Sequence, residues 1–293
     1  MILRIKYFIL LLPLLLLSAC ETDVKDVLLP EFSQKLVVTG FMSPMDNEMK
    51  FTVSLNKRIY GELNLEEPII PTTAFLSDGS KEVELDPVAY GFRIGSERIA
   101  FDYGKTYSLR ISDGKELSIE SASTIPFKRD FYLKADTFMY KNSFQMDPGH
   151  YYNENVINVK VSLTDFPGEK NYYRLVGEVT NYYTFRNTGD IIRNNYSLTF
   201  EKQYFTDNLT DGKVISIKSE DNLYHLSSGR DSAFLRLFLL NTEESYYLYH
   251  KSIMDHNDGE NPFAEATPVF SNIKGGLGVF ASYTIDSLIL RLK

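Results

Sequence analysis

The feature that most restricts the fold is an alternation of apolar and polar residues that recurs from Lys35 onward. The runs are short, as in residues 51–55 and 156–163, and turn-forming residues separate one run from the next. Successive side chains of a strand point to opposite faces of its sheet, so alternation indicates strands with one buried face. The sequence therefore predicts a mainly β protein.

Two Asp-Gly turns, Asp78-Gly79 and Asp113-Gly114, each separate a pair of alternating runs. Asp-Gly in this position predicts a β-hairpin, because these residues tolerate the positive φ of a tight turn. With the neighbouring runs, about seven or eight strands fall within residues 35–126, which indicates an immunoglobulin-like β-sandwich. The chain has one cysteine and no tryptophan, unlike antibody domains, so this prediction rests on pattern alone.

Residues 127–293 are predicted to form a second, larger β-rich domain, either a sandwich or barrel-like, with one packed helix. We place the domain boundary at the Thr124-Ile125-Pro126 junction. Residues 156–163 give the clearest strand of this half, and the polar stretch 141–155 before it predicts a loop.

The helix is expected near residues 242–256. Asn241 begins a polar cap with an acidic residue three positions later, which is typical of a helix N-terminus. Tyr246, Tyr249 and His250 then recur at helical spacing. This apolar stripe would pack on a sheet.

The N-terminus has the layout of a secretory signal. Arg4 and Lys6 precede an apolar run over residues 7–17, and small residues follow it before Cys20. The run is too short for a membrane-spanning helix, which needs roughly twenty residues. We therefore predict a lipoprotein signal peptide over residues 1–19.

Cys20 is the single cysteine of the chain, and Leu17-Ser18-Ala19-Cys20 resembles a bacterial lipobox. The resemblance implies cleavage before Cys20 and acylation of that residue with palmitate-like chains, which would anchor the protein to a membrane. An exported free thiol would otherwise be a reactive liability. Residues 20–34 would then form an acylated, flexible tether.

The acidic residues of segment 21–26 resemble the surface-export signal of Bacteroidota-type lipoproteins, which implies an outer-membrane location facing the cell surface. A solvated acidic tether is the alternative. The formal net charge is −8, which disfavours binding to nucleic acid.

No catalytic set, metal site or cofactor can be read from the residues. The four histidines are expected at the surface or at the edge of a core. His250 and His256 are six apart, about 120° around a helix, and cannot share a metal ion there. Residues 255–266 lack the glycine and glutamate positions of an EF-hand, which leaves only a looser calcium site open. We expect a protein that is not an enzyme.

Doubled tyrosines, such as Tyr172-Tyr173 and Tyr246-Tyr247, offer an alternative role in ligand binding. Each pair within a strand would send one ring inward and one outward. The outward rings could then bind glycans or peptides.

Several segments resemble the lipoproteins that carry the "domain of unknown function 4249". The most specific is the stretch from Asn261-Pro262-Phe263 to Gly275-Gly276 and Gly278. Supporting segments are 36–40, 124–126, 171–175 and 205–213. The resemblance brings no catalytic residues. Members of this family are often encoded beside TonB-dependent outer-membrane transporters, so the resemblance implies an accessory role at such a transporter.

Two readings of this stretch stay open. The glycines and the Asn-Pro-Phe turn could form a structural corner before the last strand, since glycine permits positive φ and close packing. They could instead contact a ligand or a transporter. The overall expectation is a non-enzymatic outer-membrane lipoprotein, an accessory or ligand-binding component of a TonB-dependent uptake system. The alternatives are an independent surface glycan- or peptide-binding protein and, further off, an enzyme or envelope scaffold.

Overall fold

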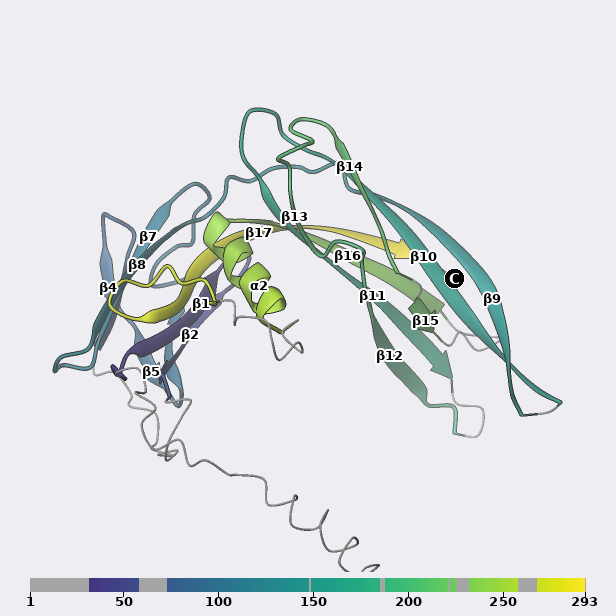
Figure 1. The fold of residues 1–293 in the computed structure, drawn as a ribbon, viewed down its shortest axis with the longest axis horizontal. Helices are drawn as coiled ribbons and strands as arrows, with labels where there is room; N and C mark the ends of the chain where they lie inside the picture. The colour runs from purple at the N-terminus through teal and green to yellow at the C-terminus, as the bar shows by residue number, and fades with distance from the viewer. Residues whose placement is uncertain are drawn as a thin grey trace, which may run out of the picture. The chain divides into compact units, whose positions relative to one another are not determined.

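The computed structural model describes most of the chain (Figure 1). Segments Gln34–Lys57 and Leu65–Lys293 form one compact unit, whose fold is given below. Of the other unit, Met1–Ser33 with Arg58–Asn64, only residues 32 and 33 are described. The described residues are 32–57, 73–147, 149–184, 188–220, 222–224, 232–257 and 268–292.

The described residues form strands and a single helix, which confirms the predicted mainly β class. No helix within these ranges is long and apolar enough to cross a membrane. The elements are β1 (Leu36–Met42), β2 (Glu48–Leu55), β3 (Thr73–Ser77), β4 (Glu82–Glu84), β5 (Asp86–Val88), β6 (Gly91–Gly95), β7 (Thr106–Ser112), β8 (Ser118–Thr124), β9 (Lys134–Asp147), β10 (His150–Thr164), β11 (Tyr172–Thr184), β12 (Ile191–Leu198), β13 (Tyr204–Thr206), β14 (Val214–Lys218), β15 (Asn222–Tyr224), β16 (Ser232–Thr242), α2 (Glu244–Asn257) and β17 (Leu277–Arg291).

The N-terminal half is a sandwich, as predicted. Strands β1, β2, β6 and β5 face a four-stranded sheet of order β4-β3-β7-β8. Side chains from both sheets, among them Phe51 and Tyr107, are fully buried in one apolar cluster between them. Both predicted hairpins are present as β3–β4 and β7–β8. The Oδ1 atoms of Asp78 and Asp113 accept hydrogen bonds from backbone N–H groups of their own turns, which stabilises the hairpins.

The C-terminal half is also built from two facing sheets. Strands β12, β11, β16 and β17 lie side by side, and β10 with β9, β14 and β15 forms the facing sheet. Leucines of β16 and alternate residues of β10, such as Val159 and Val161, meet in a second apolar cluster. Within the described residues these sheets are open, so the sandwich alternative holds and the barrel-like one does not.

Strand β17 connects the two halves. It pairs in parallel with β1, from Val37↔Leu277 to Met42↔Ser282, and antiparallel with β16. The result is a nine-stranded sheet with β13 beside β11. The domain boundary at residue 126 stays a prediction. What the structure adds is a backbone hydrogen-bonded sheet that continues from one half into the other.

The loop predicted over residues 141–155 is wrong. Strands β9 and β10 continue through this stretch and pair with each other from Lys134↔Ser162 to His150↔Asp147. Gly149, directly before β10, has a φ of +88°. Polar side chains concealed the strands, because a two-stranded extension beyond the core needs backbone pairing but no alternation of apolar residues.

Helix α2 lies against the nine-stranded sheet, on the face opposite both sandwich cores (Figure 1). Tyr246 is buried against Val279 and Ala281 of β17, and Tyr249 and Phe41 pack around them. The predicted helix and its apolar stripe are therefore confirmed, with the start two residues later than expected.

Two glycines with positive φ allow a direct test of the packing at β17. Gly278 has a φ of +103°, and a Cβ atom there would lie 2.0 Å from the carbonyl oxygen of Val38. Gly79 has a φ of +84° and open space around it. We expect Gly79→Ala to lower the free energy of unfolding by about 1–2 kcal/mol, the cost of a left-handed conformation. Gly278→Ala should cost clearly more, because β1 must also move. Urea unfolding of both variants measures the difference, and equal losses would contradict this view of the β1–β17 junction.

Candidate functional site

The glycines of the family signature lie where the last strand enters the sheet. A Cβ atom on Gly275 would lie 2.4 Å from the carbonyl oxygen of Ser118 on β8. On Gly276 it would lie 2.6 Å from the carbonyl oxygen of Leu36, and Gly278 closely approaches β1 in the same way. Packing against β8 and β1 accounts for all three glycines. Asn261, Pro262, Phe263 and Cys20 lie outside the described residues, so their predicted roles stay predictions.

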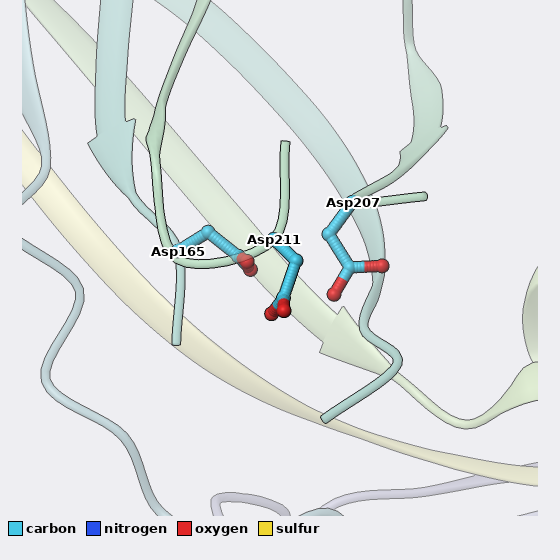
Figure 2. Close-up of side chains that lie close together, drawn as sticks. All are labelled: Asp165, Asp207 and Asp211. Atoms are coloured by element: carbon cyan, nitrogen blue, oxygen red, sulfur yellow. The ribbon is translucent and has the colours of Figure 1, made fainter. Parts of the chain in front are cut away.

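Three aspartates of the C-terminal half lie close together (Figure 2). Asp165 follows β10, and Asp207 and Asp211 lie in the turn between β13 and β14. One carboxylate oxygen of each lies within 4.8 Å of the others. Asp165 and Asp207 are buried, whereas Asp211 is exposed.

The same carboxylates hold two turns together. Asp165 accepts hydrogen bonds from the Tyr173 hydroxyl and, at 2.9 Å, from the backbone N–H of Gly212. Asp207 accepts from the backbone N–H of Asn171 at 2.9 Å. Asp211 accepts from the N–H of Gly168 at 2.8 Å. The turn after β10 and the turn after β13 are thus tied to each other by side chains of both.

Electrostatics at this cluster disfavour the charged form of Asp207. The pKa of Asp207 is raised, mainly by burial, with further contributions from the charges of Asp165 and Asp211. Burial and the Asp165 carboxylate also raise the pKa of Tyr173, so its hydroxyl keeps the proton that it donates. Three carboxylates offer oxygen ligands of the kind that Ca²⁺ and Mg²⁺ take. The hydrogen bonds of these carboxylates indicate that the cluster holds the turn after β10 and the turn after β13 together, and we call this role the clamp.

Sequence reasoning missed this cluster, although it had singled out two of its parts. Segments 171–175 and 205–213 were noted for their resemblance to the family, and the structure places them in contact through Asn171 and Asp207. Asp165 carried no signal of its own. The usable hint was that Asp165 and Asp211 each lie next to a glycine-containing turn, where carboxylates often cap backbone N–H groups.

A second buried polar group lies where β8, α2 and β17 meet. The Glu243 carboxylate accepts a hydrogen bond from Ser123, and the backbone N–H of Glu243 donates to the carbonyl of Ser282 at 3.0 Å. Ser282 in turn donates to the carbonyl of Thr124 at 2.7 Å. Burial raises the pKa of Glu243 to about 6, and these hydrogen bonds lower it in part. The Glu243 carboxyl group therefore changes its charge near pH 6.

His250 lies at the edge of a core, as expected. Its ring stacks on Tyr204 at a centroid distance of 5.5 Å, and its Nδ1 atom lies 2.9 Å from the carbonyl oxygen of Tyr246. Arg174 donates to the Tyr246 hydroxyl at 2.7 Å and lies over the Tyr204 ring. Burial lowers the pKa of His250, which keeps the ring neutral beside Arg174.

One doubled pair, Tyr172-Tyr173, differs from the prediction. Tyr172 and Tyr173 do point to opposite faces of β11, but both are buried, at 7% and 0% exposed. Tyr173 lies in the second core, and Tyr172 packs on Tyr247 of α2 at 5.3 Å. The expected outward ring is therefore covered by the helix. Among the described residues, strongly exposed rings belong to separate segments: Tyr90, Tyr103, Phe127, Tyr132, and Phe138 with Tyr140 on β9.

These features define a class of mainly β protein, with two packed sandwiches sharing one sheet and a helix on its far face. The model of the family "Domain of unknown function (DUF4249)" matches residues 21–289. The chain belongs to this family, which confirms the resemblance noted in the sequence. A solved structure, "Biofilm associated protein - B domain", is similar at 10% identity, covering 86% of this chain and 85% of that one, with a TM-score of 0.18. No curated protein matches the sequence significantly.

Two substitutions test separately the hydrogen bonds and the negative charge of the aspartate cluster. Asp165→Ala removes the acceptor of the buried Tyr173 hydroxyl and of the Gly212 N–H. We expect a loss of about 2 kcal/mol or more in the free energy of unfolding, since buried donors without acceptors cost roughly 1–3 kcal/mol each. Asp211→Asn keeps an oxygen for Gly168 and removes one negative charge, so its stability should be unchanged or higher. Urea unfolding at neutral pH measures both, and a stable Asp165→Ala variant would refute the clamp.

The raised pKa of Glu243 predicts a specific pH dependence. The folded state holds the Glu243 proton more tightly than the unfolded chain, whose pKa is near 4.5. Relative to Glu243→Gln, the wild type should therefore gain up to about 2 kcal/mol of stability as the pH falls from above 6 to 4.5. Denaturation of both proteins at pH 7.5 and pH 4.5 gives the difference. A constant difference across this range would show that Glu243 has an ordinary pKa.

Proposed function

We propose that this chain is a non-enzymatic lipoprotein of the outer membrane that faces the cell surface. It would serve as an accessory or ligand-binding component of a TonB-dependent uptake system. The membrane attachment is an acylated Cys20, and the body carries the binding surface. Nucleic acid is not among its partners in this proposal.

The observation that carries the proposal is the end of the signal segment, Leu17-Ser18-Ala19-Cys20, in a chain with no other cysteine. The sequence layout of charge, apolar run and small residues before that cysteine accounts for its presence, and acylation accounts for its isolation. The acidic residues directly after Cys20 support a position on the outer face.

The structure supports a binding role through the way its polar groups are used. Asp165 and Asp207 hold turns, Glu243 joins β8 to β17, and His250 packs at the edge of a core. Each of these groups has a structural partner that explains its position. A hydrogen-bonded sheet whose polar groups have structural roles is suited to presenting a surface.

Protease treatment of intact cells tests the location. We expect the body of the protein to be digested from intact cells, because an acylated tether on the outer face exposes it to the enzyme. A soluble periplasmic protein serves as the control for membrane integrity and should survive. Immunoblotting reads both. Protection of this protein until lysis would place it in the periplasm and would favour an envelope scaffold.

The Cys20→Ser variant tests the anchor separately. Without the thiol the chain cannot be acylated, so it should leave the membrane fraction and appear as soluble protein. Fractionation followed by immunoblotting measures this. Continued membrane association of Cys20→Ser would mean that the attachment does not depend on lipid.

A further inference from the structure

Two buried carboxylates of the aspartate cluster have no cationic side chain paired with them. Asp165 and Asp207 are buried, and Asp211 completes the group at the surface (Figure 2). No lysine, arginine or histidine of the described residues forms an ion pair with any of the three. Buried charges in proteins are paired with opposite charges or coordinate metal ions. The hydrogen bonds of the clamp satisfy oxygen atoms but bring no positive charge.

A buried amide oxygen next to the cluster lacks a hydrogen-bond donor. Asn171 is 7% exposed, and no donor in the described part of the chain reaches its Oδ1 atom. A buried acceptor without a partner destabilises a folded protein, so native structures rarely keep one. This oxygen is an observation separate from the carboxylates, because it takes no part in the clamp and carries no charge.

The register of β11 and β13 directs the Asn171 side chain to the cluster. The two strands pair antiparallel, and one further step of their register sets Asn171 opposite Asp207. The backbone N–H of Asp207 donates to the carbonyl of Asn171 at 3.4 Å, which agrees with that register. Opposite residues, and residues two apart on a strand, share a face. Tyr173 lies two residues beyond Asn171, and its hydroxyl reaches Asp165. The Asn171 side chain is therefore on the face that carries the carboxylates.

The four side chains together offer oxygen ligands that the clamp does not use up. A carboxylate has about four acceptor positions. Hydrogen bonds from Tyr173 and Gly212 take two positions of Asp165, and the N–H of Gly168 takes one position of Asp211. Carboxylate and amide oxygens are ligands of hard cations, and Ca²⁺ takes roughly six to eight of them in a flexible geometry. Mg²⁺ requires a nearly ideal octahedron, which side chains already held by two turns have little freedom to form.

We propose that Asp165, Asp207, Asp211 and the Oδ1 atom of Asn171 form a calcium-binding site. The exposed Asp211 gives the ion a path from solvent, and water molecules supply the remaining ligands. The ion compensates the buried negative charge and gives Oδ1 of Asn171 a partner. It also adds the start of β11 to the two turns that the clamp holds. This site goes beyond the proposed function, because it depends neither on the location of the protein nor on a transporter.

Calorimetric titration of the full-length protein, purified in detergent and freed of metal with EDTA and dialysis, tests the site. We expect one Ca²⁺ ion to bind with a Kd of about 0.1–1 mM, the range of extracellular calcium modules. Calcium at about ten times the Kd should raise the thermal midpoint by about 3–5 °C, and Mg²⁺ should raise it clearly less. Absence of binding at about 10 mM Ca²⁺, or an equal effect of Mg²⁺, would overturn the proposal.

Two substitutions of the same chemistry locate the ion. Asp211→Asn removes one charge of the site and keeps an oxygen for its turn, so Ca²⁺ binding should weaken by about tenfold or more. Asp190→Asn makes the same change at an exposed aspartate next to β12. Since Ile191 pairs with Thr184, this control lies at the end of β11 far from Asn171, and its affinity should equal that of the wild type. Equal affinities of all three proteins would mean that the ion binds elsewhere.

Asn171→Leu tests whether the amide is a ligand or a structural group. Leucine has nearly the shape of asparagine but no oxygen. In EDTA the thermal midpoint should be unchanged or higher, because a buried acceptor without a partner is removed. The Kd for Ca²⁺ should nevertheless rise by about threefold or more, since one ligand is lost. A lower midpoint in EDTA together with an unchanged Kd would show that the amide is structural and would overturn the site as proposed.

Discussion

The structure depends on the parallel pairing of β1 with β17. These strands come from opposite ends of the described chain, and six residue pairs join them. The entropy of closing so long a segment grows only slowly with its length, at about 1.5 RT ln n. Packing offsets this cost, because β17 supplies packing to every apolar cluster. Phe280 lies in the first, Leu288 and Leu290 contact the second, and Val279 lies in the third.

As a consequence, the two sandwiches and the helix do not contribute independently to the free energy of unfolding. A change that shifts the entry of β17, such as a side chain at Gly278, acts on the first core and on the helix together. Residues that contact one another in this way give non-additive effects on stability. The family signature from Gly275 to Gly278 lies at this entry, which gives the glycines a physical reason that needs no ligand.

The sequence predicts an element well when neighbouring residues determine it, and poorly when residues far apart in the chain do. Asp78-Gly79 and Asp113-Gly114 gave their hairpins correctly, because a turn depends on a few neighbouring residues. The helix was located to within two residues for the same reason. The pairing of β9 with β10 past residue 141 left no apolar pattern, and Asp165 meets Asp207 only after the chain has folded. Long-range pairing of backbone or of carboxylates leaves little trace in a single sequence, here only the glycine-containing turns beside Asp165 and Asp211.

Helix α2 is shorter than the strands on which it packs. Helix α2 has 14 residues and is about 21 Å long. Strand β11 has 13 residues and strand β17 has 15, so each is about 40 Å long or longer. A single helix cannot cover strands of that length, so part of the sheet must face something else.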